Sequence, residues 1–264
     1  MAGIPLFIFF LLFFSFGLII GSFLNVVIYR YQTKSLGGRS ACMSCRSKLE
    51  FYELVPVVSY LALGGRCRSC KTKISLQYPL VEMLTGVIFV SLFWKFQEVF
   101  YVDVYVFAGT FLFYAVMFSL LLVISIYDLR HKIIPDQLSF IFGLIAFFGI
   151  FLFNTSGFFP HTPSLLEFLS GIIVAFPFAV LWLVSKGTWM GLGDGKLAIG
   201  LGWLLGLARA TSGVVVAFWS GAIIGIILLI TQRKYGMKSE IPFAPFLALG
   251  AYIAFIFELH LFPL

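Results

Sequence analysis

Charged side chains are scarce in this sequence, which excludes an ordinary soluble domain. Asp, Glu, Lys and Arg together make up 11% of the 264 residues, whereas 61% of the residues are hydrophobic and 33 are phenylalanine. Soluble globular domains carry about 25% charged residues. Apolar runs near the ~20 residues that cross a bilayer as a helix recur along the chain. We therefore predict an all-α polytopic membrane protein.

Several common catalytic motifs are also missing. No H-E-x-x-H motif of zinc proteases occurs, and no serine is paired with a convincing histidine and aspartate. His131, His161 and His260 lack the spacing of metal ligands. The glycine-rich run at 191–195 lacks the strand context of a nucleotide-binding loop. The corresponding hydrolase and nucleotide-binding classes are therefore excluded.

The apolar runs predict about eight transmembrane helices. Their approximate ranges are 4–29, 78–96, 105–127, 137–153, 165–184, 196–207, 211–230 and 242–261. The first run lacks the basic start and the small-residue cleavage pattern of a secretory signal, so we expect a retained helix.

Basic residues are concentrated in the loop at 30–73. It holds nine Lys and Arg against two Glu, a net charge of +7, and cytosolic loops of membrane proteins are enriched in Lys and Arg. With eight spans, only Lys95 and Arg209 fall on the outer side. We therefore expect a cytosolic loop and both chain ends outside.

The four cysteines all lie in this loop, as the pairs Cys42/Cys45 and Cys67/Cys70. Two C-x-x-C knuckles supply the four thiolates that tetrahedral zinc favours. Two disulfides are the alternative, although a cytosolic loop lies in a reducing compartment. We predict structural zinc, because four protein ligands leave no position for a catalytic water.

Two acids stand where membrane chemistry would need them. Asp128 ends the third predicted span, and Asp194 follows Gly191 and Gly193 at the start of the sixth, before Lys196. These glycines permit unusual backbone angles and close approach of a substrate. Two carboxylates that share a proton can activate water and protonate a leaving amine. Since a helix N-terminus favours negative charge, we expect Asp194 ionised and Asp128 protonated.

Structural roles remain open for these and other acids. Asp194 alone could be a helix N-cap, and Asp128 an ordinary loop charge. Asp136, after Pro135, fits a capping or turn role and is the reserve catalytic residue. Glu82, inside the second span, faces either the bundle interior or a substrate path, and structural pairing is an equal alternative.

The chain resembles the bifunctional type IV prepilin peptidases, which belong to the GxGD-type intramembrane aspartic proteases. The resemblance runs nearly end to end and is carried, beside the cysteine pairs, by the segments 21–30 (GSFLNVVIYR), 74–75 (IS), 78–82 (YPLVE), Asp128 with 134–136 (IPD), 191–196 (GLGDGK) and 241–246 (IPFAPF). One departure is Met43, where many members have Pro after the first cysteine.

This resemblance implies a function and its residues. Prepilins or pseudopilins would be cleaved after a leader ending in Gly at the cytosolic face of the bacterial inner membrane, with Asp128 and Asp194 catalytic. S-adenosylmethionine would then methylate the new N-terminal residue, with Gly65 and Glu82 as the weaker candidates for that activity. The implied parts are a first transmembrane helix at 1–29, a zinc-binding loop domain at 30–77 associated with methylation, and a seven-helix peptidase domain at 78–264.

Other readings predict different features. A proton-coupled transporter would need carboxylates near the midplane and repeated halves, and a membrane scaffold would leave the 191–196 run without purpose. A peptidase without methylation is the nearest enzymatic alternative, against which the cysteine loop argues. We expect the basic loop to engage anionic lipid, and expect no nucleic-acid partner.

Overall fold

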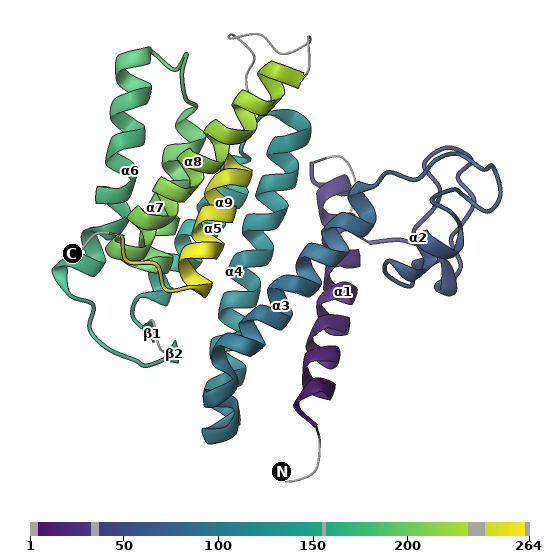
Figure 1. Ribbon diagram of the computed structural model, residues 1–264, viewed down its shortest axis with the longest axis horizontal. Helices are drawn as coiled ribbons and strands as arrows, with labels where there is room; N and C mark the ends of the chain where they lie inside the picture. Colours follow the sequence, from purple (N-terminus) through teal and green to yellow (C-terminus); the bar gives the residue numbers. More distant parts are fainter. Residues whose placement is uncertain (1–4, 33–36, 155–156, 232–240, 262–264) are drawn as a thin grey trace. The chain divides into compact units, whose positions relative to one another are not determined.

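Long apolar helices dominate the part of the chain that the structure describes, residues 5–32, 37–154, 157–231 and 241–261 (Figure 1). The structure is a computed structural model that separates into two units, residues 1–97 and 98–264. The predicted division at residues 29/30 and 77/78 follows function rather than packing and stays a prediction.

The first unit consists of two apolar helices and the cysteine loop between them. The helices are α1 (Leu6–Arg30) and α3 (Gln77–Val102), whose last turns enter the second unit, and the loop contains η1 (Phe51–Leu54) and α2 (Val58–Ala62). A Cβ added at Gly17 of α1 would lie 2.8 Å from the Cα of Gly86 in α3. Small residues therefore let the two backbones approach closely, as is common between membrane helices.

The second unit is a helical bundle around α7 (Leu192–Leu205). The other helices are α4 (Val104–His131), α5 (Asp136–Gly149), α6 (Leu165–Ser185), α8 (Leu207–Thr231) and α9 (Ala244–Ile256). α7 contacts α5, α6, α8 and α9, more of the other helices than any other helix of this unit. The short strands β1 (Phe153–Asn154) and β2 (Gly157–Phe158) form an antiparallel pair, a small exception to the predicted all-α fold.

Local sequence signals explain where these helices begin and end. Asp103 separates α3 from α4 and accepts hydrogen bonds from the N–H groups of Tyr105 and Val106, as an N-cap does. Ser164 and Glu167 form a reciprocal capping box at the start of α6. Such caps satisfy N–H groups that the first turn of a helix leaves without partners.

A helix occurs at each of the eight predicted positions, but eight membrane spans are not confirmed. By length and composition, five helices are candidate spans in the described part of the chain: α1, α3, α4, α6 and α8. The other three, α5, α7 and α9, have 13 or 14 residues, about 20 Å at 1.5 Å per residue and short of the ~30 Å hydrocarbon core. The predicted sidedness depends on the span count and stays a prediction, and Ile4, the predicted start of the first span, lies outside the described residues.

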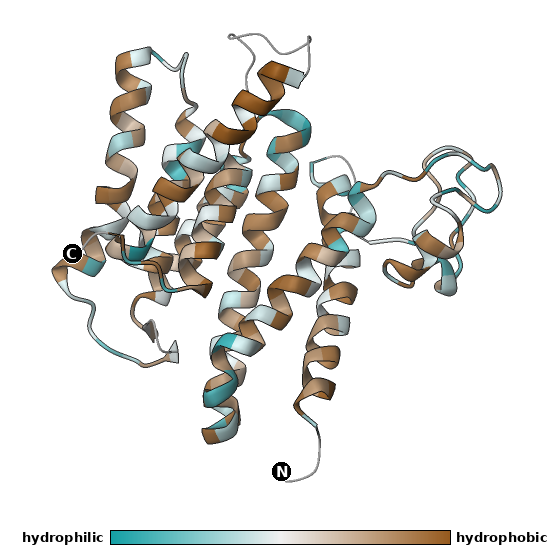
Figure 2. Ribbon diagram, in the orientation of Figure 1, coloured by the Kyte–Doolittle hydropathy of each residue, from teal (hydrophilic) through white to brown (hydrophobic). Residues whose placement is uncertain are grey.

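Hydropathy supports a membrane location for the five long helices. Figure 2 shows α1 and α8 hydrophobic along most of their length, whereas the cysteine loop mixes hydrophilic and hydrophobic stretches. Large apolar side chains on both helices are exposed, including Phe7, Phe16, Trp219 and Ile230. Lipid can cover such side chains, since the backbone polar groups in the interior of a helix are hydrogen-bonded within the helix.

Candidate functional site

Asp128 and Asp194 come together in the second unit. Asp128 lies in the last turn of α4 and Asp194 in the first turn of α7, and their residues are only 4% and 8% exposed. The two carboxyl groups are close enough for their charges to interact. Two buried acids that repel each other cannot both be ionised without cost, so the arrangement favours a pair that shares one proton.

The carboxyl group of Asp128 is bound to the start of α9. The backbone N–H of Ala244, the first residue of that helix, donates a hydrogen bond to Oδ2 of Asp128 over 3.1 Å. This N–H is one of those that the first turn of a helix leaves without an internal partner, and it favours a negative acceptor. Asp128 is thereby positioned by the 241–246 segment, a role that the sequence does not reveal.

Asp194 lies inside the first turn of α7 and is not its N-cap. Gly191 occupies the N-cap position, so the capping alternative for Asp194 is wrong. Its Oδ1 is buried and has no hydrogen-bond partner among the described residues. Asp128 lies at the C-terminal end of α4 and Asp194 at the N-terminal end of α7, as predicted, but Asp128 also accepts an N–H from the first turn of α9. The ends of their own helices therefore do not decide which acid is ionised, and the predicted ionised Asp194 stays a prediction.

The glycines of the 191–195 run adopt ordinary backbone angles. Gly193 and Gly195 are helical, and Gly191 is extended with φ −75° and ψ 149°, so the unusual angles that glycine permits are not adopted here. The absence of a side chain at Gly193 lets Ile134 pack closely against the start of α7, because an added Cβ would lie 3.0 Å from the Cβ of Ile134. The run therefore packs against the segment that carries the IPD motif.

Asp136 and Lys196 form an exposed ion pair beside this contact. Nζ of Lys196 lies 2.6 Å from Oδ1 of Asp136, and the two side chains are 44% and 73% exposed. Asp136 is the first residue of α5, whose N-cap is Pro135, so the capping role predicted for Asp136 itself is not observed. The pair joins the start of α5 to the first turns of α7 rather than joining the buried acids.

The four cysteines converge, as the spacing predicts. Their Sγ atoms all lie within 4.8 Å of one another, and those of Cys42 and Cys70 are 3.8 Å apart. A tetrahedral site with Zn–S bonds of ~2.3 Å has S···S distances of about 3.8 Å. All four thiols are free, so the disulfide alternative is not observed.

The two knuckles have the same backbone design. The N–H of Cys42 donates to the carbonyl of Ser47, and the N–H of Cys67 donates to that of Thr72. Single antiparallel bridges close both knuckles, Ala41 with Lys48 and Arg66 with Lys73. Hydrogen bonds with the side chain and backbone of Thr72 lower the pKa of the Cys70 thiol to about 6, which favours the metal-binding thiolate.

Family comparisons agree with this arrangement. The model of the bacterial peptidase A24 N-terminal domain matches residues 15–96, and that of the type IV leader peptidase family matches residues 115–230. A protein of Pseudomonas aeruginosa named prepilin leader peptidase/N-methyltransferase is 32% identical, over 91% of this chain and 87% of its own length. The chain belongs to the type IV leader peptidase family.

Other members of the family are similarly related. A protein of the same name in Myxococcus xanthus is 35% identical, over 89% of this chain and 67% of the relative. One in Neisseria gonorrhoeae is 30% identical, over 90% of this chain and 87% of the relative. No solved structure matches the chain. Family membership therefore rests on sequence.

The two further candidates of this family member, Gly65 and Glu82, both belong to the first unit. Gly65 has a φ of +66°, and a Cβ added there would lie 2.8 Å from the hydroxyl oxygen of Tyr60. Glu82 is buried in α3, and its Oε2 accepts a hydrogen bond from the N–H of Val57 over 2.7 Å. No direct contact joins Gly65 to Glu82 among the described residues.

Val57, which sequence reasoning missed, has an unusual conformation. Its φ of 61° and ψ of −48° form a tight turn in which the N–H of Val58 donates to the carbonyl of Pro56 over 2.6 Å. A β-branched residue at positive φ is strained, and such strain persists only where surrounding structure holds it. The buried carboxyl group of Glu82 supplies part of that hold. Nothing in the local sequence predicts a positive φ at a valine.

Proposed function

We propose that the protein removes the leader peptide of type IV prepilins or pseudopilins after Gly, at the cytosolic face of the inner membrane, and then methylates the new N-terminal amine. The observation that carries this proposal is the buried pair Asp128 and Asp194, brought together from α4 and α7. The names of the relatives in Pseudomonas aeruginosa, Myxococcus xanthus and Neisseria gonorrhoeae support both activities.

The pair has the parts that aspartic proteolysis requires. We assign the shared proton to Asp194, because its buried Oδ1 has no partner among the described residues and a neutral acid tolerates burial best. Asp128, which accepts the N–H of Ala244, is the ionised partner and takes a proton from water as the water attacks the scissile carbonyl carbon. Asp194 donates its proton to the carbonyl oxygen, which gives a tetrahedral intermediate with two hydroxyl groups. As the C–N bond breaks, Asp128 gives the proton it took from water to the leaving amine, and Asp194 takes a proton back from one hydroxyl group.

Zinc fits the cysteine cluster. Cys42, Cys45, Cys67 and Cys70 are free thiols whose spacing suits a tetrahedral sulfur site. With four protein ligands the metal would be structural and would hold the two knuckles together. Metal analysis of the purified protein should find about one zinc per chain, and Cys42→Ser should lower it. Full zinc content in the variant would refute this assignment.

S-adenosylmethionine is the methyl donor that the methyltransferase name implies, and we place its use with the first unit. The support comes from the segment 57–65. Within it Gly65 lies against Tyr60, and the strained turn at Val57 is held by a hydrogen bond to Glu82 of α3. Strained turns of this kind concentrate at functional sites. Gly65 and Glu82 would shape the segment rather than react themselves.

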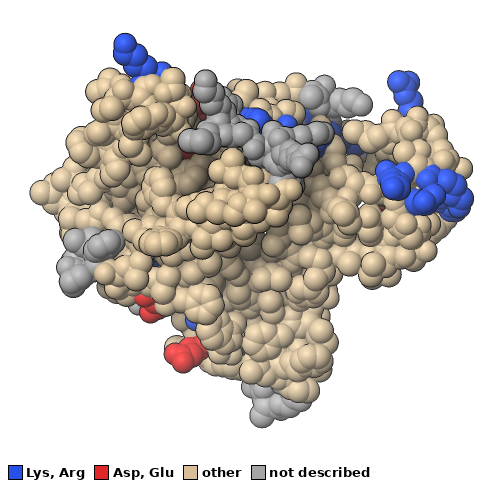
Figure 3. All heavy atoms as spheres, turned by 45° about the horizontal axis from the view of Figure 1, so that its top comes forward, with Lys and Arg blue, Asp and Glu red and all other residues tan. Residues whose placement is uncertain are grey.

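The cysteine loop also presents a basic surface. Figure 3 shows Lys and Arg side chains gathered on it, and its basic residues include Arg39, Arg46, Lys48 and Arg66. Each basic residue near an anionic membrane surface contributes about 1 kcal/mol of attraction. We propose that this loop contacts anionic lipid. Equal binding to anionic and neutral bilayers would refute that contact.

Mass spectrometry of a prepilin after incubation with the protein tests the proposed function. With S-adenosylmethionine present, we expect one new N-terminus directly after the leader Gly, and that product should carry one methyl group. Without S-adenosylmethionine, the same cleavage should leave an unmethylated product. An intact prepilin, or cleavage at another position, would contradict the proposal.

A further inference from the structure

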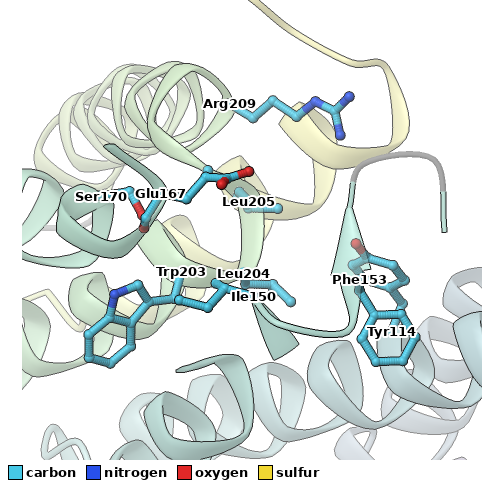
Figure 4. Close-up of a pocket in the computed structure, with 10 residues that line it drawn as sticks. Tyr114, Ile150, Phe153, Glu167, Ser170, Trp203, Leu204, Leu205 and Arg209 are labelled. Atoms are coloured by element: carbon cyan, nitrogen blue, oxygen red, sulfur yellow. The ribbon is translucent and has the colours of Figure 1, made fainter. Parts of the chain in front are cut away.

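A pocket at the far end of α7 has no part in the chemistry described above. Its volume is about 130 Å³, and it is lined by Tyr114, Ile150, Phe153, Glu167, Ser170, Trp203, Leu204, Leu205, Gly206 and Arg209 (Figure 4). Leu205 lies eleven positions after Asp194 in α7, about 16 Å along the helix axis. The pocket is therefore distinct from the candidate active site.

Arg209 brings an unsatisfied donor to this pocket. The residue is 6% exposed, and its buried Nε has no hydrogen-bond partner among the residues that the structure describes. Nη2 of Arg209 lies 3.7 Å from Oε1 of Glu258, whose side chain is half exposed. A buried guanidinium N–H without a partner is costly, and five donors in a planar fork suit a phosphate group. An anionic group in the pocket would satisfy it.

Glu167 supplies the opposite charge from α6. One oxygen, Oε2, accepts from the N–H and the hydroxyl of Ser164 at 2.7 and 2.9 Å. Among the described residues, the other oxygen, Oε1, has only a long contact of 3.7 Å, with Nε2 of His161. Oε1 can therefore accept hydrogen bonds from an ammonium group. A purely anionic ligand would be repelled by Glu167, so the pocket suits a ligand that carries both charges.

The surroundings favour a lipid headgroup over a soluble ligand. Glu167 and Arg209 lie in the first turns of α6 and α8, both of which are candidate membrane spans, so the pocket lies where such spans begin. Tyr114 and Trp203 line it, and these residue types are enriched where membranes meet water. The volume of the pocket is also several times the volume that one water molecule requires, so it can hold a larger polar group.

We propose that this pocket binds the headgroup of a phospholipid with a primary amine, its phosphate on Arg209 and its ammonium on Glu167. A quaternary ammonium headgroup has no N–H to donate to Oε1 of Glu167. A glycerol headgroup has no positive charge and leaves Glu167 unpaired. Phosphatidylethanolamine should therefore bind more tightly than phosphatidylcholine or phosphatidylglycerol with the same acyl chains.

Native mass spectrometry of the full chain in detergent, with each of these three lipids, tests the proposal. We expect the ethanolamine lipid to bind at least about tenfold more tightly than the other two, and Arg209→Gln to remove that advantage. Glu258→Gln is the matched control, because Glu258 pairs with Arg209 but does not line the pocket, and this variant should keep the preference. Equal binding of the three lipids to the wild type would overturn the proposal.

A second variant keeps the test decisive if Arg209→Gln does not fold. Glu167→Gln retains a side chain that can complete a capping box, and it loses only the charge. We expect this variant to bind the ethanolamine and glycerol lipids with affinities within about threefold of each other. An unchanged preference for the ethanolamine lipid in this variant would refute the assigned role of Glu167. Leader cleavage by each variant serves as the check on folding.

Discussion

The backbone N–H of Ala244 donates a hydrogen bond to Oδ2 of Asp128 although 116 residues separate them in the chain. The contact fixes one carboxyl group of the candidate pair against the first turn of α9. It also gives the 241–246 segment a physical role, since that segment delivers an otherwise unpaired N–H to an acid.

Ala244→Pro removes this N–H at the first helical position, where proline is accepted. We expect prepilin cleavage to slow about tenfold or more, because a hydrogen bond to a charged group contributes roughly 1.5–3 kcal/mol. Ala244→Gly keeps the N–H and should cleave at close to the wild-type rate. Proline at position 244 also restricts the backbone of Phe243, so the unfolding temperature of the variant should be compared with that of the wild type to check that the fold is intact. Equal rates for the two variants would argue against this role of the hydrogen bond.

Gly193→Ala tests the close contact between the 191–195 run and Ile134. The new Cβ would lie 3.0 Å from the Cβ of Ile134, so the start of α7 must shift by a few tenths of an ångström. Since small displacements of catalytic groups are costly, we expect kcat to fall by about tenfold.

The neighbouring Gly195 offers a matched control. A Cβ there would meet the Cβ of Phe178 at an ordinary 3.6 Å. Gly195→Ala should therefore keep its kcat and raise the free energy of unfolding by up to about 1 kcal/mol, because alanine is the better helix former. A larger loss of kcat in Gly195→Ala than in Gly193→Ala would contradict the packing argument.

Asp136→Asn breaks the ion pair with Lys196 and removes the reserve catalytic acid. Both side chains are largely exposed, and exposed ion pairs contribute about 0–1 kcal/mol, so we expect kcat/KM to stay within about fivefold of the wild type. Lys196→Met should have an effect of the same size. Complete loss of cleavage in Asp136→Asn alone would place Asp136 in the catalytic machinery.

Gly65→Ala should impair methylation and leave cleavage intact. The added Cβ would lie 2.8 Å from the Tyr60 hydroxyl at a backbone φ of +66°. Gly64→Ala controls for the backbone strain, since Gly64 has a φ of +58° but nothing within 4 Å of an added Cβ. The methylated fraction of the cleaved product, measured by mass spectrometry, should fall much further for Gly65→Ala than for Gly64→Ala.

Local patterns predicted the helices and the cysteine cluster well, because the information lies within short segments. Two C-x-x-C pairs are sufficient to place four thiols within 4.8 Å. Apolar runs located a helix at each of the eight predicted positions, although their lengths support only five candidate spans in the described part of the chain. Periodicity and composition indicate that a segment is helical and apolar, but not how deeply a short helix enters the bilayer.

The contacts that shape the candidate site depend on distant segments and could not be predicted. Neither the N–H of Ala244 at Asp128 nor that of Val57 at Glu82 leaves a side-chain signal, because backbone donors are present at every residue other than proline. The same limit applies to proton sharing. Asp128 lies at the C-terminal end of α4, as predicted, but the N–H of Ala244 reaches it from the start of α9, and no local pattern indicates that contact.

The rate of prepilin cleavage by Asp128→Asn, Asp194→Asn and the double variant tests the shared-proton pair most directly. If the two acids act as one unit, each single variant should lose at least about a thousandfold in kcat, and the double variant should be no slower. A single variant that retains substantial cleavage, or losses that multiply in the double variant, would show that the two carboxyl groups act independently and contradict the proposed mechanism.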